Sequence, residues 1–162
     1  KKMAMLANSV VFTSQGVSFM LAGEEFLRTK GGNENSYDAS YKVNELDYSL
    51  KIKHMDMFNN YQKLIEIKQN EALFSKSNAE CKALKVLTNA NGSVIYFDLV
   101  DEDLGLTYRI VHCNGVTSGD KSVNLEGYTL YLDTLNVENI SLTASYQMQN
   151  YQTIIAYKNI SE

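Results

Sequence analysis

Residues 94–111 read VIYFDLVDEDLGLTYRIV, and this stretch decides the fold of the second half of the chain. Large apolar side chains occupy every second position on both sides of a central DEDLG segment at 101–105. A period of two is typical of β-strands, because successive side chains of a strand point to opposite faces. The acidic segment that ends in glycine is typical of a turn. The stretch therefore predicts two antiparallel strands joined by a short connection.

Further strands are expected on either side of this pair. The same alternation returns at residues 128–132. Asn91-Gly92 is a strong hairpin signal, since both residues tolerate positive φ, and Thr117-Ser118-Gly119-Asp120 predicts another turn. Short strands with turn signals about every ten residues are typical of an antiparallel sandwich. We therefore expect residues 73–162 to form an all-β C-terminal sandwich domain.

The first 47 residues change character twice. Residues 1–22 are small and apolar, and Gly16 predicts the end of a buried helix near Thr13, followed by a short buried strand. Residues 23–47 are polar and rich in glycine and asparagine, but they carry three aromatic side chains. Aromatic residues are rare in disordered linkers, so this composition favours a binding loop.

An amphipathic helix is predicted after this loop, ending near Asn70. Apolar side chains recur at three- and four-residue spacings with polar ones between them. Asp47 or Ser49 would accept hydrogen bonds from the first free backbone N–H groups. We expect Met55 and Met57 to fill the core beneath the helix.

Composition excludes several classes of partner. The 162 residues carry a formal net charge of −4 without a basic cluster, so we expect no nucleic-acid partner. No apolar run approaches the roughly 18 residues that span a bilayer, so we expect no membrane partner. The chain opens Lys1-Lys2-Met3, without the layout of a signal peptide, which suggests a piece of something longer.

Few residues outside the loop could carry chemistry. His54 and His112 lack a second histidine at metal-ligand spacing, so neither a metal nor another cofactor is implied. His112 and Cys113 are neighbours on a predicted strand and point to opposite faces, which excludes a catalytic pair. Glu24 and Glu25 lie where the predicted strand meets the polar loop, the position at which α/β enzymes assemble their sites.

One part of the first half resembles a known family. TSQGVSFMLAGEEFLRTK at 13–30 looks like the last barrel strand of type I pullulanases, the starch-debranching members of glycoside hydrolase family 13 in the α-amylase superfamily. GNENSY at 32–37 and VNELDY at 43–48 resemble their loop before the final barrel helix. Tyr48 stands where the family usually has tryptophan, and Ser18 stands where it usually has proline.

The resemblance implies an α+β fold class. Residues 1–72 would be the tail of a (β/α)8 barrel, with its last helix, strand, loop and helix, followed by the sandwich at 73–162. The bacterial parent would hydrolyse α-1,6-glucosidic branch linkages in pullulan, amylopectin or glycogen. In the family the reacting carboxylates precede the matched stretch, so no residue of this chain is assigned a catalytic role. We expect this segment to need a missing N-terminal barrel portion and to be inactive alone.

The resemblance also implies roles for residues of the loop. Glu25 matches a glutamate that would support the catalytic residues by holding an arginine in a bidentate pair; a helix-start charge without a partner is the alternative. The implied cleft residues would bind a branched α-glucan through amides, a phenol and an aromatic face. These candidates are Arg28, Asn33, Asn35 and Tyr37, for which a loop held by its own Asx turns is the alternative.

Two further interpretations stay open. The chain could be a non-catalytic α-glucan-binding β-sandwich module, or a purely structural module. Because a large apolar patch is rare on soluble monomers, residues 1–22 should either fold back over the sandwich and helix 49–70 or mediate self-association. In the binding module, alternating strand tyrosines would form a stacking platform from Tyr96, Tyr108, Tyr128, Tyr131 and Tyr146.

Overall fold

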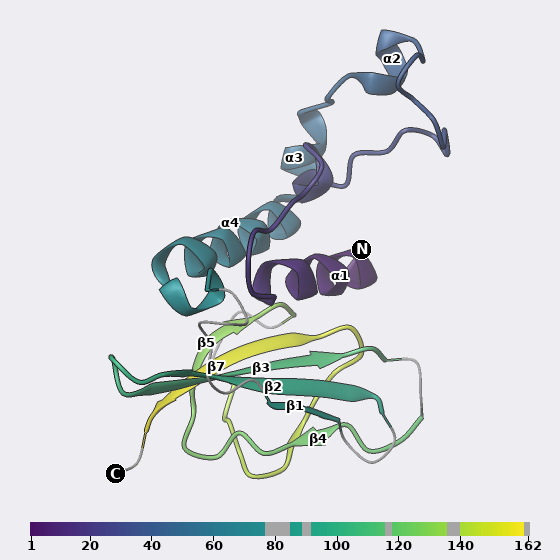
Figure 1. The fold of residues 1–162 in the computed structure, drawn as a ribbon. Helices are drawn as coiled ribbons and strands as arrows, with labels where there is room; N and C mark the ends of the chain where they lie inside the picture. Colours follow the sequence, from purple (N-terminus) through teal and green to yellow (C-terminus); the bar gives the residue numbers. More distant parts are fainter. Residues whose placement is uncertain (77–84, 89–91, 116–117, 136–139, 161–162) are drawn as a thin grey trace. The chain divides into compact units, whose positions relative to one another are not determined.

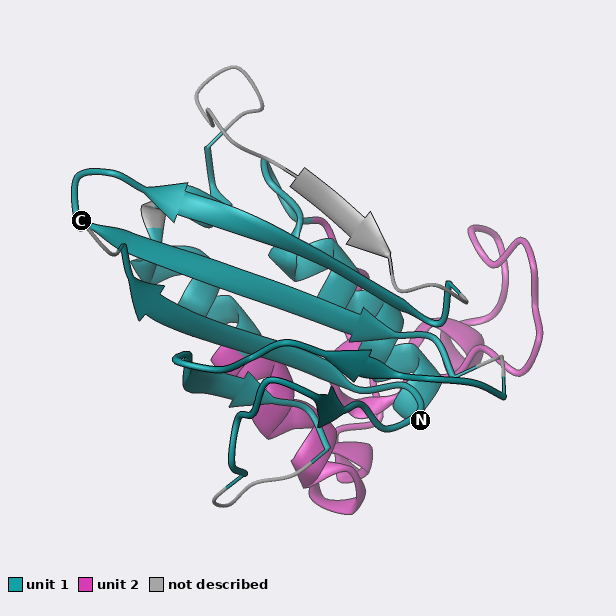
Figure 2. Ribbon diagram, turned by 90° about the horizontal axis from the view of Figure 1, so that it is seen from below, with its two compact units in different colours: residues 1–18, 64–162 teal, residues 19–63 magenta. Residues whose placement is uncertain are grey.

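A computed structural model describes residues 1–76, 85–88, 92–115, 118–135 and 140–160, which form two compact units. One unit consists of residues 1–18 with 64–162, and the other of residues 19–63 (Figure 2). The helical elements are α1 (Lys2–Thr13), η1 (Glu24–Phe26), α2 (Tyr41–Asn44), α3 (Ser49–Lys53), α4 (Met55–Asn70) and η2 (Ala72–Phe74). The strands are β1 (Lys85–Thr88), β2 (Val94–Asp101), β3 (Leu106–Cys113), β4 (Ser122–Val123), β5 (Thr129–Asp133), β6 (Tyr146–Gln147) and β7 (Thr153–Asn159).

The first unit is built on a five-stranded antiparallel sheet in the order β1-β2-β3-β7-β5 (Figure 1). The two strands predicted from residues 94–111 pair along their whole length. Asp101 holds the turn between them, since its Oδ1 accepts a hydrogen bond from the Leu104 N–H at 3.0 Å. The α+β class with antiparallel sheets is therefore confirmed. Asn91 and Thr117, which belong to the other predicted turns, lie outside the described residues.

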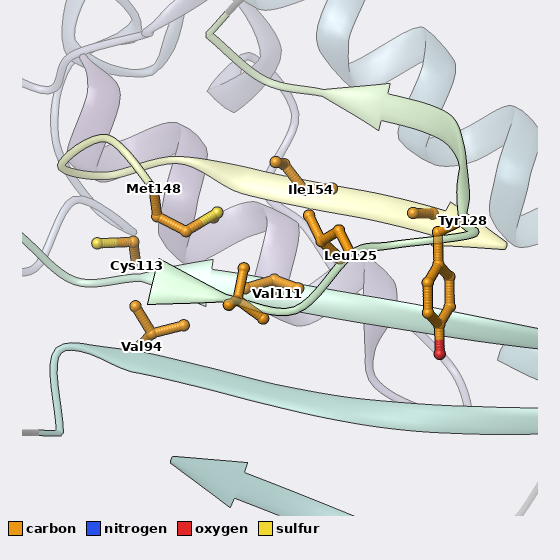
Figure 3. Packing of buried hydrophobic residues seen from close by; sticks show 9 residues of the cluster. Val94, Val111, Cys113, Leu125, Tyr128, Met148 and Ile154 are labelled. Atoms are coloured by element: carbon orange, nitrogen blue, oxygen red, sulfur yellow. The ribbon is translucent and has the colours of Figure 1, made fainter. Parts of the chain in front are cut away.

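A two-stranded sheet of β4 and β6 shares a hydrophobic core with the larger sheet. Cys113 contributes to this core from the end of β3, as a buried cysteine in a strand is expected to do. Because β3 alternates, its odd-numbered residues at this end face the smaller sheet. The buried members of the cluster are Val94, Val111, Cys113, Val123, Leu125, Tyr128, Met148, Ile154 and Ala156 (Figure 3).

The opposite face of the five-stranded sheet packs against α1 (Figure 1). Thr13, at the end of α1, places its Oγ1 3.2 Å from Nε2 of His112 on β3. Nδ1 of the same ring lies 2.9 Å from Oγ1 of Thr153 on β7. His112 is thus a buried histidine with hydrogen-bond partners, and it points away from the Cys113 side. α1 covers part of this face of the sheet, whereas the choice between fold-back and self-association for residues 1–22 as a whole stays a prediction.

The short buried strand predicted after α1 is not formed. Residues 17–20 have no regular secondary structure, Val17 is fully exposed and Phe19 is 87% exposed. A strand is stable only where a neighbour pairs with its backbone and another layer covers its side chains. Among the described residues, no strand pairs with this segment.

The helix predicted up to Asn70 is divided at His54. α3 ends before this residue and α4 begins after it, because His54 leaves the helical region with φ −123° and ψ 38°. Asp47 stabilises the start of α3, where its Oδ1 accepts a hydrogen bond from the Ser49 N–H at 2.9 Å. Met57 is buried as predicted, but the prediction for Met55 is wrong, since its side chain is 41% exposed.

Candidate functional site

Glu25 lies in the single helical turn η1, which follows Gly23. Gly23 has φ +98°, a conformation that favours glycine. The Gly23 N–H donates a hydrogen bond to Oε2 of Glu25 at 2.8 Å. Phe26, the next residue, is buried, and its ring centroid lies 5.7 Å from that of Tyr48. The Glu25 carboxylate therefore stabilises its own turn, and its predicted contact with an arginine stays a prediction.

Arg28 lies at the base of the polar loop, against main-chain acceptors. Its Nη1 donates to the Ala22 carbonyl at 3.3 Å, and its Nη2 donates to the Asn44 carbonyl. The Arg28 N–H donates to the Gly23 carbonyl at 2.9 Å. The predicted cleft residue is thus engaged by the backbone at both ends of the loop.

The predicted residues Asn33, Asn35 and Tyr37 lie together on the outer part of the same loop. Oδ1 of Asn33 accepts a hydrogen bond from the Asn35 N–H at 3.1 Å, which is an Asx turn of the kind weighed as the alternative. Both asparagines are exposed, and the Tyr37 side chain is 83% exposed. The asparagines therefore help to shape the loop, whereas the Tyr37 ring is available to a ligand.

Sequence reasoning missed two residues of this region as site candidates. Tyr41 begins α2 and is 73% exposed, so it adds a second accessible aromatic ring. Asn44 ends α2, and its Nδ2 donates to the carbonyls of Ser36 at 2.7 Å and Ala39 at 3.4 Å. The aromatic composition of residues 23–47 could have pointed to Tyr41, but no local pattern indicates the contacts of Asn44.

The carboxylates of Glu24 and Glu25 act on the nearby Tyr61 phenol. Burial, followed by the charges of Glu24 and Glu25, raises the pKa of the Tyr61 phenol well above its ordinary value. The phenol is therefore neutral at ordinary pH. Exposed aromatic faces beside uncharged amides suit the binding of a neutral, hydroxyl-rich ligand.

The strand tyrosines are largely occupied by other protein groups. Tyr108 and Tyr128 are buried, and the Arg109 guanidinium lies 4.9 Å from the centroid of the Tyr128 ring. The hydroxyls of Tyr108 and Tyr131 donate to the Glu71 carboxylate at 2.7 and 3.0 Å. Tyr108 and Tyr128 consequently serve the packing of the first unit, whereas Tyr96, Tyr131 and Tyr146 stay partly exposed.

Other features of the described residues do not add a site. A cavity of about 410 Å³ lies between α1 and the end of α4, but the Nζ of Lys68 in its wall donates to the carbonyls of Ser14 and Phe74. The described part of the chain holds no group of three His, Cys, Asp or Glu side chains able to bind a metal ion. Within that part, every helix is too short or too polar to cross a membrane.

These features define an α+β protein whose antiparallel sheets follow a helical region with a polar, aromatic-bearing loop. The pullulanase of Bacillus subtilis (strain 168) is 33% identical over 87 residues, which are 49% of this chain and 12% of the relative. The pullulanase from Bacillus acidopullulyticus superposes with a TM-score of 0.78 at 29% identity, over 97% of this chain and 20% of that one. No protein-family model matches the chain.

A third relative was determined with a sugar bound. This Paenibacillus barengoltzii pullulanase variant, complexed with maltotetraose, has a TM-score of 0.75 and 25% identity over 96% of this chain and 25% of its own. The resemblance predicted from residues 13–48 is thereby confirmed: the chain is homologous to a carboxy-terminal portion of the pullulanases, which are glycoside hydrolases. It spans only 12% to 25% of the length of these three relatives.

Proposed function

We propose that this chain is the carboxy-terminal segment of an enzyme that hydrolyses α-1,6-glucosidic branch linkages in pullulan, amylopectin or glycogen. Residues 1–72 complete the catalytic barrel of that enzyme, and residues 73–162 form its carboxy-terminal sandwich. The segment supplies part of the cleft wall and structural support. The reacting carboxylates reside on the preceding barrel portion, so the segment is inactive alone.

The observation that carries this proposal is the similarity of nearly the whole chain to one portion of the pullulanase structures. A maltotetraose complex of one relative supports an α-glucan as the ligand class. The loop of residues 23–44 supports it too, because it presents Tyr37 and Tyr41 as accessible rings beside exposed asparagines. Aromatic faces cover the apolar C–H surfaces of pyranose rings.

A chimeric enzyme tests the proposal. This chain replaces the matching portion of a pullulanase, and reducing sugar released from pullulan is measured. We expect turnover by the chimera and none by the truncated barrel or by the pure chain. In the active chimera, Glu25→Gln should lower kcat more than it raises KM if Glu25 supports the reacting groups. Turnover by the pure chain, or a folded chimera without activity, contradicts the proposal.

A non-catalytic α-glucan-binding module is the second candidate, and the exposed Tyr37 ring favours it. Titration of the pure chain with maltotetraose separates the two functions. Binding at millimolar or tighter affinity, weakened by Tyr37→Ala but not by Lys42→Ala on the same loop, would support an autonomous binding module. If no binding is measured, the loop binds glucan only together with the rest of the cleft, and the binding-module function is excluded.

The exposed apolar segment after α1 supports a contact with the missing N-terminal barrel portion. The side chains of Val17 and Phe19 are exposed, and the residues between and after them are less exposed. This alternation is typical of a strand, and here its apolar face is uncovered. Without that partner, the same surface is suited to self-association through residues 1–22. Sedimentation of the pure chain should then show a dimer that Val17→Ser with Phe19→Ser converts to a monomer; a monomer at all concentrations contradicts this expectation.

A further inference from the structure

We infer that Arg28 is a positioning residue that closes the polar loop of residues 23–44 and so fixes where Tyr37 is presented. This inference deepens the proposed function, and it rests on that function only for the consequence for glucan binding.

The Arg28 guanidinium joins the two ends of the loop. Its Nη1 donates to the Ala22 carbonyl, immediately before the loop, at 3.3 Å. Its Nη2 donates to the carbonyl of Asn44, 16 residues further along the chain. Both acceptors are main-chain oxygens, so these hydrogen bonds restrain the backbone itself at each end. Charge-assisted hydrogen bonds of this kind are stronger than neutral ones.

The close approach of Arg28 to the first end depends on glycine at position 23. A Cβ built on Gly23 would lie 2.7 Å from the Arg28 Cβ and 2.8 Å from its Cδ, at a backbone φ of +98°. The planar guanidinium can donate to two carbonyls at once, whereas the single ammonium of a lysine cannot reach both in the same way. Gly23 and Arg28 therefore act together at the base of the loop.

From Asn44 the restraint continues to the middle of the loop. Its Nδ2 donates to the carbonyls of Ser36 and Ala39, which lie on either side of Tyr37. Hydrogen bonds thus connect Arg28 through Asn44 to the residue that precedes Tyr37. This connection leaves the ring itself exposed while it restrains the backbone that carries the ring.

Direct contact between Arg28 and a glucan is the competing role. Each terminal nitrogen of Arg28 already donates to a carbonyl of the protein, and Nε is buried. Because each terminal nitrogen carries a second N–H, a ligand could also bind there without displacing the contacts that shape the loop. The two roles predict different effects when Arg28 is replaced, because only a positioning residue changes the mobility of the loop without any ligand.

The absence of tryptophan from the sequence permits a clean test. Tyr37→Trp in the full chain provides a single fluorescent reporter at an exposed position of the loop. In that background, Arg28→Lys keeps the positive charge but loses the planar guanidinium that donates to two carbonyls. Asn44→Ala removes the side-chain hydrogen bonds to Ser36 and Ala39 while it keeps the main-chain carbonyl of residue 44. Lys42→Met, at an exposed position of the same loop, is the matched control.

The measurements are amide hydrogen exchange of residues 29–43, anisotropy of the reporter and its quenching by maltotetraose. For Arg28→Lys we expect exchange at least tenfold faster across the loop, lower anisotropy and at least tenfold weaker maltotetraose binding. Asn44→Ala should affect mainly residues 36–39. Exchange in β2, β3 and β7 should not change in either variant, and Lys42→Met should leave every readout unchanged.

Three results for Arg28→Lys would overturn the inference. Weaker maltotetraose binding without faster amide exchange would indicate direct contact, and unchanged exchange and binding would show that Arg28 does not position the loop. Faster exchange that includes β3 would indicate a general loss of stability. If the chain with intact Arg28 does not bind maltotetraose, that result argues against autonomous binding by the loop. Exchange and anisotropy then still decide whether Arg28 closes it.

Discussion

The buried His112 ring makes the stability of the first unit depend on pH. Its Nε2 lies 3.2 Å from Oγ1 of Thr13, and its Nδ1 lies 2.9 Å from Oγ1 of Thr153. The ring of Phe97 packs beside it, with centroids 6.2 Å apart. These neighbours carry no charge, and burial lowers the pKa of His112 from 6.5 to about 4. The folded unit therefore favours the neutral imidazole.

The sign and size of the effect follow from proton linkage. Between pH 6.5 and 4 the unfolded chain binds a proton at His112 that the folded chain does not bind. The contribution of His112 to the free energy of unfolding is thus fully present above pH 6.5 and is lost as the pH falls through this window. A pKa difference of about 2.5 units, at about 1.4 kcal/mol per unit, corresponds to about 3–4 kcal/mol in total, of which about 3 kcal/mol is lost by pH 4.

Urea unfolding of the wild-type chain and of His112→Asn, followed by circular dichroism between pH 7.5 and 4, measures this loss. The variant lacks the titrating group, so the stability difference between the two proteins should shrink by about 3 kcal/mol across the window. His54→Asn controls for the removal of a histidine elsewhere. A difference that stays constant from pH 7.5 to 4, or an NMR titration of His112 with its midpoint near 6.5, would refute the reasoning.

Two further predictions concern side chains that connect elements of the first unit. Glu71→Gln should destabilise this unit by about 2 kcal/mol, because the carboxylate accepts hydrogen bonds from Tyr108 and Tyr131. In urea unfolding, Tyr108→Phe should lower the free energy of unfolding more than Tyr131→Phe does. The reverse order would contradict this assignment. Arg109→Lys should lower the free energy of unfolding by about 1–2 kcal/mol, since Arg109 Nε and Nη2 each donate to the Asp98 carboxylate at 2.7 Å. Thermal unfolding of the single and double variants tests this pair. If Arg109→Lys has no effect in the Asp98→Asn background, the pair is supported, whereas additive effects would count against it.

The central strands were predictable because their information is local. Alternating side chains specify which face of β2 and β3 is covered. His112 and Cys113 are adjacent in sequence, and they therefore lie on opposite faces of the sheet. The division of the long helix was not predictable in this way. Apolar spacing continues through His54, so the pattern alone does not report the change in its backbone conformation. The strand expected after α1 failed for a related reason, since strand formation depends on a pairing partner as well as on sequence.

The same distinction separates the predictable and the unpredictable parts of the candidate site. The Asx turn of Asn33 follows from a side chain that reaches a backbone N–H two residues away, and asparagine in a polar stretch predicts it. The acceptors of Arg28 are main-chain carbonyls, which every residue type possesses, and one of them lies 16 residues away. No choice of amino acid at Asn44 marks its carbonyl as an acceptor; the closure of the loop alone brings it to the guanidinium. The sequence could therefore indicate that Arg28 belongs to the functional loop. The hydrogen bonds show how Arg28 acts: it restrains the backbone of the loop, and it affects Tyr37 only through that backbone.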